Sequence, residues 1–439
     1  MTGDQALQLG IAIAAGAVGV LFVVTSRSSR DSISSVTGFL GGLVAVQVGG
    51  FHLFTIVVTV WFATRRREQY GNLLPLFLIP LIAVPLATTA LYGELTHNPL
   101  LAVQLLALSL SAGLVAAAAN DHDRKLMLLG LMWACFTSAF VGLLQVVGLV
   151  AVRVETLHTH VSSLGRPNGI YPEPDWLGTF SAIGMVLSWR LLRDRPSLRT
   201  LVLGVTTGGF VLAFARAAWL ALGVSVIAIL VGAAISRRRA PRATKSGSFR
   251  TLAVLGAVAV IAFAALPALR IQAVERLTSI VSGDRSDISR QARIQQNETL
   301  QRLADTAPWD GWGISASGRV GVSGRLLLGD ESGNSVASNW ALAFWVDGGY
   351  LAVPVIALFI LVAMRRFRGV AGQALVVVLV SSFFSNATYQ PVVWLLLGLA
   401  LREANSRPEV RQEQVEGQNQ DDGHPKREKR GTLNARQPV

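Results

Sequence analysis

Charged residues are scarce in this sequence, and their scarcity decides its class. Only 15% of the 439 residues are charged, whereas soluble domains carry about 25%. Hydrophobic residues make up 51% of the chain, and the mean hydropathy is +0.48. This composition excludes an ordinary soluble enzyme and is typical of an integral membrane protein.

Cysteine and the common catalytic motifs are also nearly absent. The single cysteine, Cys135, lies in an apolar run, which excludes a disulfide framework and a CxxC metal or redox site. The sequence has no phosphate-binding P-loop, dinucleotide-binding glycine motif, HExxH or GxSxG stretch. His158 and His160 would share a face only on a strand, and no third ligand follows at a useful spacing. The sequence therefore predicts no metal and no other cofactor.

Acidic residues are outnumbered by basic ones, 26 to 39, which gives a net charge of +13. A basic excess is one sign of nucleic-acid binding. In an apolar chain it more often marks cytoplasmic loops that face anionic lipid. We therefore expect the lipid bilayer, and not nucleic acid, to be the partner of these charges.

Long apolar runs are what the sequence has in abundance. A membrane-spanning helix needs about 20 mostly apolar residues, and we count twelve candidate spans. They cover residues 6–24, 36–63, 73–92, 99–119, 126–150, 176–192, 199–214, 217–235, 251–269, 348–364, 370–386 and 391–401. The second run has Gly49-Gly50 in its middle, which predicts a tilt, a kink or a break there.

Basic residues between the runs predict the orientation of the chain. They cluster in alternate loops, at 65–67, 124–125, 190–199, 237–250 and 365–368. Twelve spans place all these clusters on one side of the membrane, and that side is cytoplasmic by the positive-inside rule. Both termini are then cytoplasmic as well.

The predicted fold is an all-α polytopic membrane protein with about 12 transmembrane helices. One large extracytoplasmic loop, residues 270–347, joins helices 9 and 10. Residues 1–402 form the helical bundle. Residues 403–439 are polar and contain few apolar side chains, so we predict a disordered cytoplasmic tail.

The loop over residues 151–175 is the first candidate for chemistry. Its proline and glycine residues favour a fixed, turn-rich backbone. Its titratable candidates are His158, His160, Arg166, Glu173 and Asp175. Such a loop can present charged groups at the membrane surface, and the alternative is a plain solvated connector.

Arg216 is the second candidate, because it lies between the seventh and eighth apolar runs. We predict a tight hairpin there, with Arg216 at the outer membrane boundary. Its guanidinium either reaches the interface as an anchoring group or binds the oxygens of a phosphate, whose geometry it matches.

The long loop carries the remaining candidates. Its first part holds Arg293 and a helical pattern of Ile294, Leu300 and Leu303, which also fits a helix lying on lipid. A predicted turn follows over residues 308–313. The next stretch is rich in Gly and Ser, and its candidate residues are Arg319, Arg325 and Asn339.

Two of these segments resemble motifs of the bacterial O-antigen ligase and O-antigen polymerase superfamily. RPNGIYPEPDWLG resembles the signature R-x-x-G-x-x-x-x-P-N-x-x-G, and Asp175 stands where the family usually has Asn. FARAAWLAL resembles the stretch T-x-S-R-x-x-W/L-L-A, in which Arg216 matches and Ala215 replaces the usual Ser. The matching positions of the first signature are Arg166, Gly169, Pro174 and Gly178.

The resemblance extends through the long loop and covers residues 166–352. The run from Arg293 to Gly313 is similar to the family's entry into its large extracytoplasmic loop. SNWALAFWVDGGYLA resembles the ligase motif H-[N/S/Q]-x9-G-x-x-[G/T/Y], with Asn339 and Gly349 in register. Ser338 stands where the ligases have histidine.

The resemblance implies a metal-independent, inverting glycosyltransferase in the bacterial cytoplasmic membrane. Its donor would be a glycan linked to undecaprenyl pyrophosphate, and its acceptor a glycan or another envelope molecule. Arg166, Arg216 and Arg293 would stabilise the pyrophosphate leaving group at the outer face. Because Ser338 cannot act as a base at neutral pH, Glu173, Asp175 and His160 remain candidates for that role.

Two other functions stay open at this point. A transporter of polysaccharide or lipid-linked sugar would need polar residues along a path through the bundle, and the sequence has few, such as Gln47, His52, Gln104 and Gln145. A noncatalytic assembly protein with the same fold would have lost family residues, and Ala215 and Ser338 are two such departures.

Overall fold

The computed structural model describes ten segments of the chain. They are residues 29–43, 47–48, 51–65, 71–95, 99–149, 166–171, 173–237, 288–318, 339–384 and 390–403. The predicted first and ninth spans and the polar tail lie outside them. So do Gly49 and Gly50, and the residues His158, His160, Arg319, Arg325 and Ser338 of the long loops.

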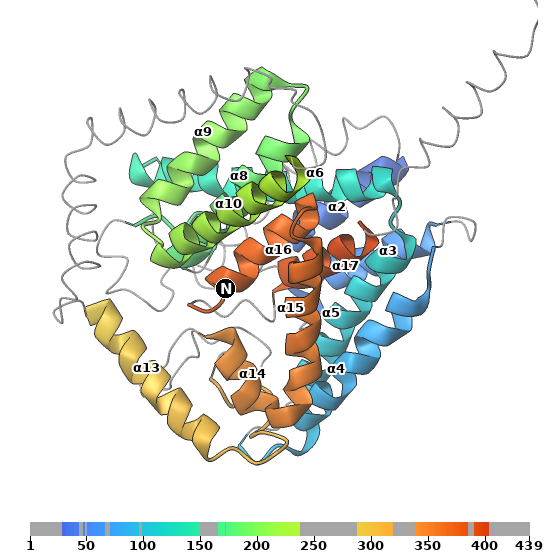
Figure 1. Ribbon diagram of the computed structural model, residues 1–439, viewed down its shortest axis with the longest axis vertical. Coiled ribbons are helices and arrows are strands. Elements are labelled where there is room, and N and C mark those ends of the chain that lie inside the picture. The colour runs from blue at the N-terminus through green and yellow to red at the C-terminus, as the bar shows by residue number, and fades with distance from the viewer. Residues whose placement is uncertain are drawn as a thin grey trace, which may run out of the picture. The chain divides into compact units, whose positions relative to one another are not determined.

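The described residues are 79% helical. The only strands among them are β1 (Gln47–Val48) and β2 (Phe51–His52). Figure 1 shows the helices, which are α2 (Ser29–Gly41), α3 (Leu53–Ala63), α4 (Leu74–Tyr92), α5 (Pro99–Ala118), α6 (Asp121–Val146), α8 (Pro174–Leu191), α9 (Pro196–Leu212), α10 (Arg216–Arg237), α13 (Ile288–Asp305), α14 (Trp340–Gly348), the 3₁₀ helix η2 (Gly349–Ala352), α15 (Val353–Arg366), α16 (Val370–Ser381) and α17 (Pro391–Arg402).

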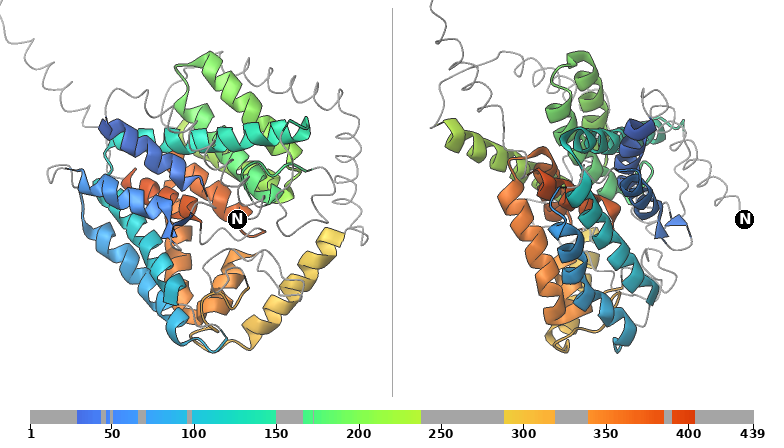
Figure 2. Two further views of the ribbon diagram at one scale, coloured as in Figure 1. Left: turned by 180° about the vertical axis from the view of Figure 1, so that it is seen from behind. Right: turned by 90° about the vertical axis from the view of Figure 1, so that its right-hand side faces the viewer.

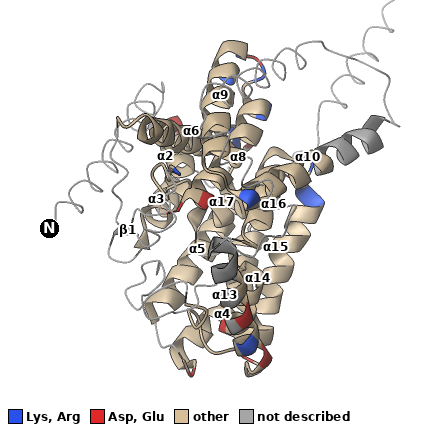
Figure 3. Cartoon of the chain, turned by 90° about the vertical axis from the view of Figure 1, so that its left-hand side faces the viewer, with Lys and Arg blue, Asp and Glu red and all other residues tan. Residues whose placement is uncertain are grey.

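Four helical stretches are long and apolar enough to cross a bilayer. They are α4, α5, α6 and the stretch Trp340–Arg366, which comprises α14, η2 and α15. No charged residue occurs in α4, α5 or α16, and Figure 3 shows how little charge the helices carry between their ends. The protein is therefore a helical membrane protein. The total of twelve spans stays a prediction.

The predicted break in the second apolar run is confirmed. α2 ends at Gly41 and α3 begins at Leu53. Between them β1 and β2 pair antiparallel, with Gln47 opposite His52. The run therefore forms two short helices that flank a small hairpin.

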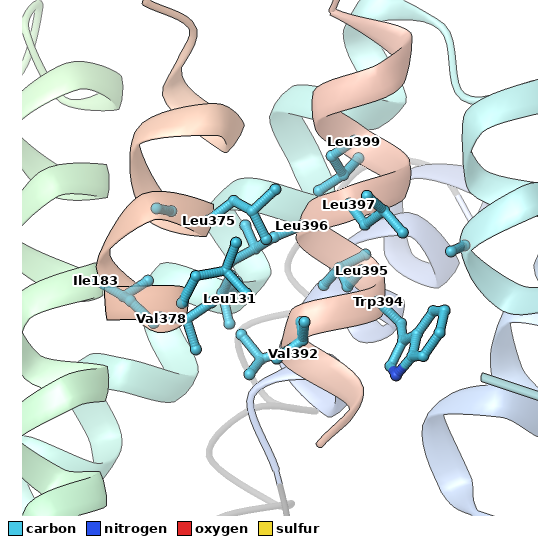
Figure 4. Packing of buried hydrophobic residues seen from close by; sticks show 14 of the residues in the cluster. Leu131, Ile183, Leu375, Val378, Val392, Trp394, Leu395, Leu396, Leu397 and Leu399 are labelled. Atoms are coloured by element: carbon cyan, nitrogen blue, oxygen red, sulfur yellow. The ribbon is translucent and has the colours of Figure 1, made fainter. Parts of the chain in front are cut away.

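The apolar core is centred on α17, whose side chains are buried all round from Pro391 to Ala400. A helix that is hydrophobic on every face belongs in an interior. It packs against α5, α15 and α16. Figure 4 shows its leucines and Trp394 beside residues from α6, α8 and α16, among them Leu131, Ile183 and Leu375. α4 and α5 lie side by side in both views of Figure 2.

Glycine allows a close helix contact between α2 and α6. A Cβ on Gly130 would run into the backbone carbonyl of Ser35, and a Cβ on Gly38 would run into that of Met127. Small residues let helix backbones approach in this way in membrane proteins, where dispersion replaces the hydrophobic effect.

A buried ion pair ties the same two helices to α3. Arg65, directly after α3, contacts Asp123 of α6 at 2.7 Å, and both side chains are almost fully buried. Ser34 of α2 donates to Asp123 Oδ1 at 2.9 Å and accepts from Arg65 Nη2 at 2.7 Å. Trp61 Nε1 donates to the same hydroxyl at 3.0 Å. The charges are compensated where water cannot solvate them.

We expect Gly130→Val to destabilise the protein, because the added side chain must separate α2 from α6. Overpacking of this kind costs about 1–3 kcal/mol of unfolding free energy. Thermal unfolding in detergent measures it. Gly204→Ala in α9 is the matched control, since a Cβ there meets nothing within 4 Å. Equal melting temperatures for the two variants would contradict the close contact.

Candidate functional site

Arg166 is the centre of the candidate site. Its side chain is only 5% exposed, and two of its donors have defined partners. Nε donates to the carbonyl oxygen of Ala213 at 2.8 Å, and Nη2 donates to Asp175 Oδ1 at 2.7 Å. Arg166 therefore ties the start of α8 to the turn between α9 and α10.

That turn is tight, as predicted, but the two helices that it joins do not form the predicted hairpin, because α9 packs on α6 and α8 whereas α10 packs on α8 and α16. α9 ends at Leu212 and α10 begins at Arg216. Phe214 adopts a φ of 48°, a left-handed conformation that is rare for a bulky residue and is held here against its own preference. The turn places Arg216 in the first position of α10, partly exposed.

α8 packs closely on this turn through small residues. A Cβ on Gly178 would lie 2.5 Å from Cβ of Ala215 and 3.2 Å from Cβ of Ala218. Glycine is therefore required at 178 for the two segments to approach. The contact brings the N-termini of α8 and α10 together with the Arg166 guanidinium.

The loop that carries Arg166 is fixed to α6 by Gln145. The Gln145 Oε1 accepts from the backbone N–H groups of Asn168 at 3.1 Å and Gly169 at 2.9 Å. Its Nε2 donates to the Gly169 carbonyl at 3.0 Å. Gly169 has a φ of 62°, which glycine adopts without strain. One buried side chain thus satisfies three backbone groups of the loop.

Tyr171 anchors the other end of the same loop. Its hydroxyl donates to the Gly42 carbonyl at 3.0 Å, and its ring stacks on Phe180 of α8 with centroids 4.3 Å apart. The loop is therefore attached to α6, to α8 and to the residue after α2.

The ends of α16 and α14 complete the junction. Thr179 of α8 shares a hydrogen bond with the hydroxyl of Ser381, the last residue of α16. The backbone N–H of Trp340 donates to the Ser382 carbonyl at 3.0 Å. Asn339 caps α14, because its side chain accepts from the N–H groups of Ala341 and Leu342 at 3.0 and 3.2 Å. The residue predicted to bind substrate has a structural role here.

The segments resembling the later family motifs also meet. The N–H of Trp312 donates to the Val346 carbonyl at 2.8 Å, and the N–H of Gly313 donates to that of Asp347 at 3.0 Å. Asp347 is fully buried and accepts from the backbone N–H of Ser317 at 2.8 Å. The predicted turn over 308–313 is confirmed, and it packs against the end of α14.

α13 confirms the helical pattern predicted in the long loop. Leu300 of this helix is fully buried and joins a small cluster with Ala343 and Val346 of α14. Trp312 Nε1 donates to the Leu303 carbonyl at 2.9 Å, which fastens the end of α13 to the turn. Arg293 lies in this helix, and its side chain is outside the described residues.

The structure thus brings some of the predicted residues together. Arg166, Asp175 and Arg216 meet at one junction, and Glu173 is the N-cap of α8 beside them. The sequence analysis missed Thr179, Ser381 and the role of Gln145. A glutamine inside an apolar run was the available signal for Gln145, and it does not say which loop the side chain holds.

The junction contains the arginines Arg166 and Arg216 and the carboxylates Asp175 and Glu173, next to the N-termini of α8 and α10. Helix N-termini carry partial positive charge and point N–H groups outward, which suits phosphate. Among the described residues no group of three or more His, Cys, Asp or Glu side chains is placed to hold a metal ion.

Comparison with known proteins does not identify a family for this chain. The sequence matches no protein-family model, and no curated protein matches it.

We expect Gln145→Met to loosen the Arg166 loop while the bundle stays folded. The substitution leaves two buried backbone N–H groups without an acceptor, and each such group lowers the stability by about 1–3 kcal/mol. Hydrogen–deuterium exchange over residues 166–171 should accelerate. Gln373→Met is the matched control, because Gln373 is equally buried in α16 and its Oε1 has no hydrogen-bond partner within the described part of the chain. Similar exchange in both variants would refute the clamp.

Proposed function

We propose that the protein transfers or polymerises a glycan carried on undecaprenyl pyrophosphate at the outer face of the bacterial cytoplasmic membrane. One observation carries the proposal. Two segments that resemble motifs of the O-antigen ligase and polymerase superfamily meet at Arg166, which bonds to Ala213 ahead of Arg216 and to Asp175. A third, at Asn339, adjoins them through α16.

The reaction needs an acceptor, a leaving group and a base. An acceptor hydroxyl oxygen attacks the anomeric carbon of the donor glycan and forms the new glycosidic bond. The bond from that carbon to the pyrophosphate oxygen breaks, with inversion, and undecaprenyl pyrophosphate leaves with the bonding electron pair. The hydroxyl proton passes to a carboxylate of the protein.

The two arginines of the junction have different roles in this proposal. Arg216 is partly exposed and stands at a helix N-terminus, so its guanidinium meets the pyrophosphate and stabilises the charge that develops there. Arg166 is buried and holds the turn that presents Arg216. The role that the resemblance implies for Arg293, which lies in α13, stays a prediction.

We assign the base to Glu173. Of the three candidates, Asp175 is engaged by Arg166 through Oδ1, and a carboxylate held in an ion pair serves to orient its partner. Glu173 is two residues away, at the N-cap of α8. It stands at the end of the helix that packs on the Arg216 turn through Gly178. His160 is the third candidate.

One contact supports the orientation with a cytoplasmic basic side. Arg190 near the end of α8 donates to the carbonyl oxygen of Arg368, after α15, at 3.3 Å. Two of the basic loops therefore lie on the same side of the bundle, as the positive-inside rule requires. The proposed arrangement has both termini on that side.

We expect Arg216→Ala to abolish complementation of a deletion strain, since loss of one preorganised charge costs roughly 100-fold in rate. The measurement is the profile of lipid-linked glycans. Single repeat units on the carrier indicate a polymerase, and long chains on the carrier indicate a ligase. Arg193→Ala, at the other end of α8, is the matched control and should complement. An unchanged profile on deletion would favour a transporter or an assembly protein.

The base assignment is tested by two isosteric changes. Glu173→Gln should lower the transfer rate by roughly 100-fold or more. Asp175→Asn should retain most of the activity, because an amide oxygen still accepts from Arg166, as Asn would at this position of the family signature. The opposite pattern assigns the base to Asp175. Full activity in both variants assigns it to His160.

A further inference from the structure

Three exposed aromatic residues gather at one end of α4 and α15. Trp309 and Tyr350 are 65% and 64% exposed, and Tyr92 is 48% exposed. The N–H of Tyr350 donates to the Trp309 carbonyl at 2.8 Å. The end of α4 joins them, because the N–H of Leu95 donates to the Trp312 carbonyl at 3.2 Å. We call Tyr92, Trp309 and Tyr350 the aromatic patch.

The aromatic patch continues two exposed apolar helix faces. On α4 these residues are Leu74, Phe77, Leu78, Leu81, Val84 and Leu91, and on α15 they are Val353, Ile360, Leu361 and Met364. Faces of this kind on a membrane protein contact the acyl chains of lipid. The aromatic patch is where both faces end.

The other ends of both helices are basic. α15 ends in Arg365 and Arg366. α4 begins near Arg402, whose guanidinium lies against Gly71. Charged groups at one end and aromatic rings at the other are the arrangement found at the two surfaces of a bilayer.

The helix lengths fit the bilayer between these ends. At the rise of regular helices, η2 and α15 together cover about 29 Å and α4 covers about 28 Å. The hydrocarbon core of a bilayer is about 30 Å thick. α4 and α15 run in opposite directions along the chain. Both nevertheless give about the same distance between the basic ends and the aromatic patch.

We propose that the aromatic patch lies in the headgroup region of the leaflet opposite the arginine-rich ends. Tryptophan and tyrosine prefer this region because their rings are apolar and their N–H and O–H groups need water or headgroup partners. The lipid interface is the partner of this surface. The proposal concerns the depth of the protein in the membrane and holds whatever reaction the protein performs.

Spin labels measure this depth directly. Cys135 is the only cysteine and is buried, so Cys135→Ala gives a background for single labels in the full chain. The labels go on Tyr350→Cys and Tyr92→Cys, in nanodiscs of phosphatidylethanolamine and phosphatidylglycerol. Leu81→Cys, exposed in the middle of α4, is the deep control. Asp194→Cys, exposed in the loop after α8, is the aqueous control.

The expected depths follow from the helix geometry. The Leu81 label should lie near the bilayer centre, and the Tyr350 and Tyr92 labels about 15 Å from it. The Asp194 label should be as accessible to a nickel chelate as a label in water. Accessibility of Tyr350 equal to that of Asp194 would overturn the proposal and make the aromatic patch a water-facing binding surface, for example for a glycan. A depth equal to that of Leu81 would overturn it too.

A second measurement needs no spin label on the aromatic patch. Brominated lipids quench tryptophan at a depth set by the position of bromine. The difference in fluorescence between the wild type and the Trp309→Phe variant is the signal of Trp309 alone. We expect bromine near the headgroup to quench this part more strongly than bromine deep in the acyl chain. The reverse order, or no quenching by either lipid, contradicts the proposal even if the labelled variants misfold.

Discussion

The buried guanidinium of Arg166 is the constraint on which the candidate site depends. A charge in a low-dielectric interior is very costly unless it is paired and hydrogen-bonded. Its partners, the Ala213 carbonyl and Asp175, come from the α9–α10 turn and from α8. The three segments must therefore assemble together, because each alone leaves a charge or a dipole unsatisfied. The position of Arg216 at the start of α10 is a result of this assembly.

The apolar runs predicted most of the described helices because burial in lipid and in the core acts on the whole length of a helix. Gly49-Gly50 indicated the break in the second run, and Arg216 between two runs indicated the tight turn between α9 and α10. The contact from Arg166 to Ala213 could not be predicted, because the spacing of residues in the sequence does not say which loop packs against which turn. Asn339 carries a helix-capping signal and is the N-cap of α14, and its role in substrate binding stays a prediction.

A second buried Arg–Asp pair stabilises another junction of the bundle. Arg65 and Asp123 join α3 to α6, and Ser34 of α2 bonds to both. Arg65 and Asp123 are far apart along the chain, and Arg166, paired with nearby Asp175, reaches the distant α9–α10 turn through the Ala213 carbonyl. Such pairs add little net stability compared with apolar packing, but they penalise every arrangement in which the helices miss their register. The two pairs fix relative position where apolar side chains alone would allow sliding.

The contact between α2 and α6 also has a consequence for how the chain is made. α2 leaves the ribosome before α3, α4 and α5, yet its close backbone partner is α6. Until α6 is synthesised, the glycine face of α2 lacks its partner helix, and Arg65 enters the membrane region before Asp123 exists. The nascent chain must keep these groups near the aqueous boundary or against the insertion machinery. Completion of α6 is therefore the step that commits the first half of the protein to its bundle.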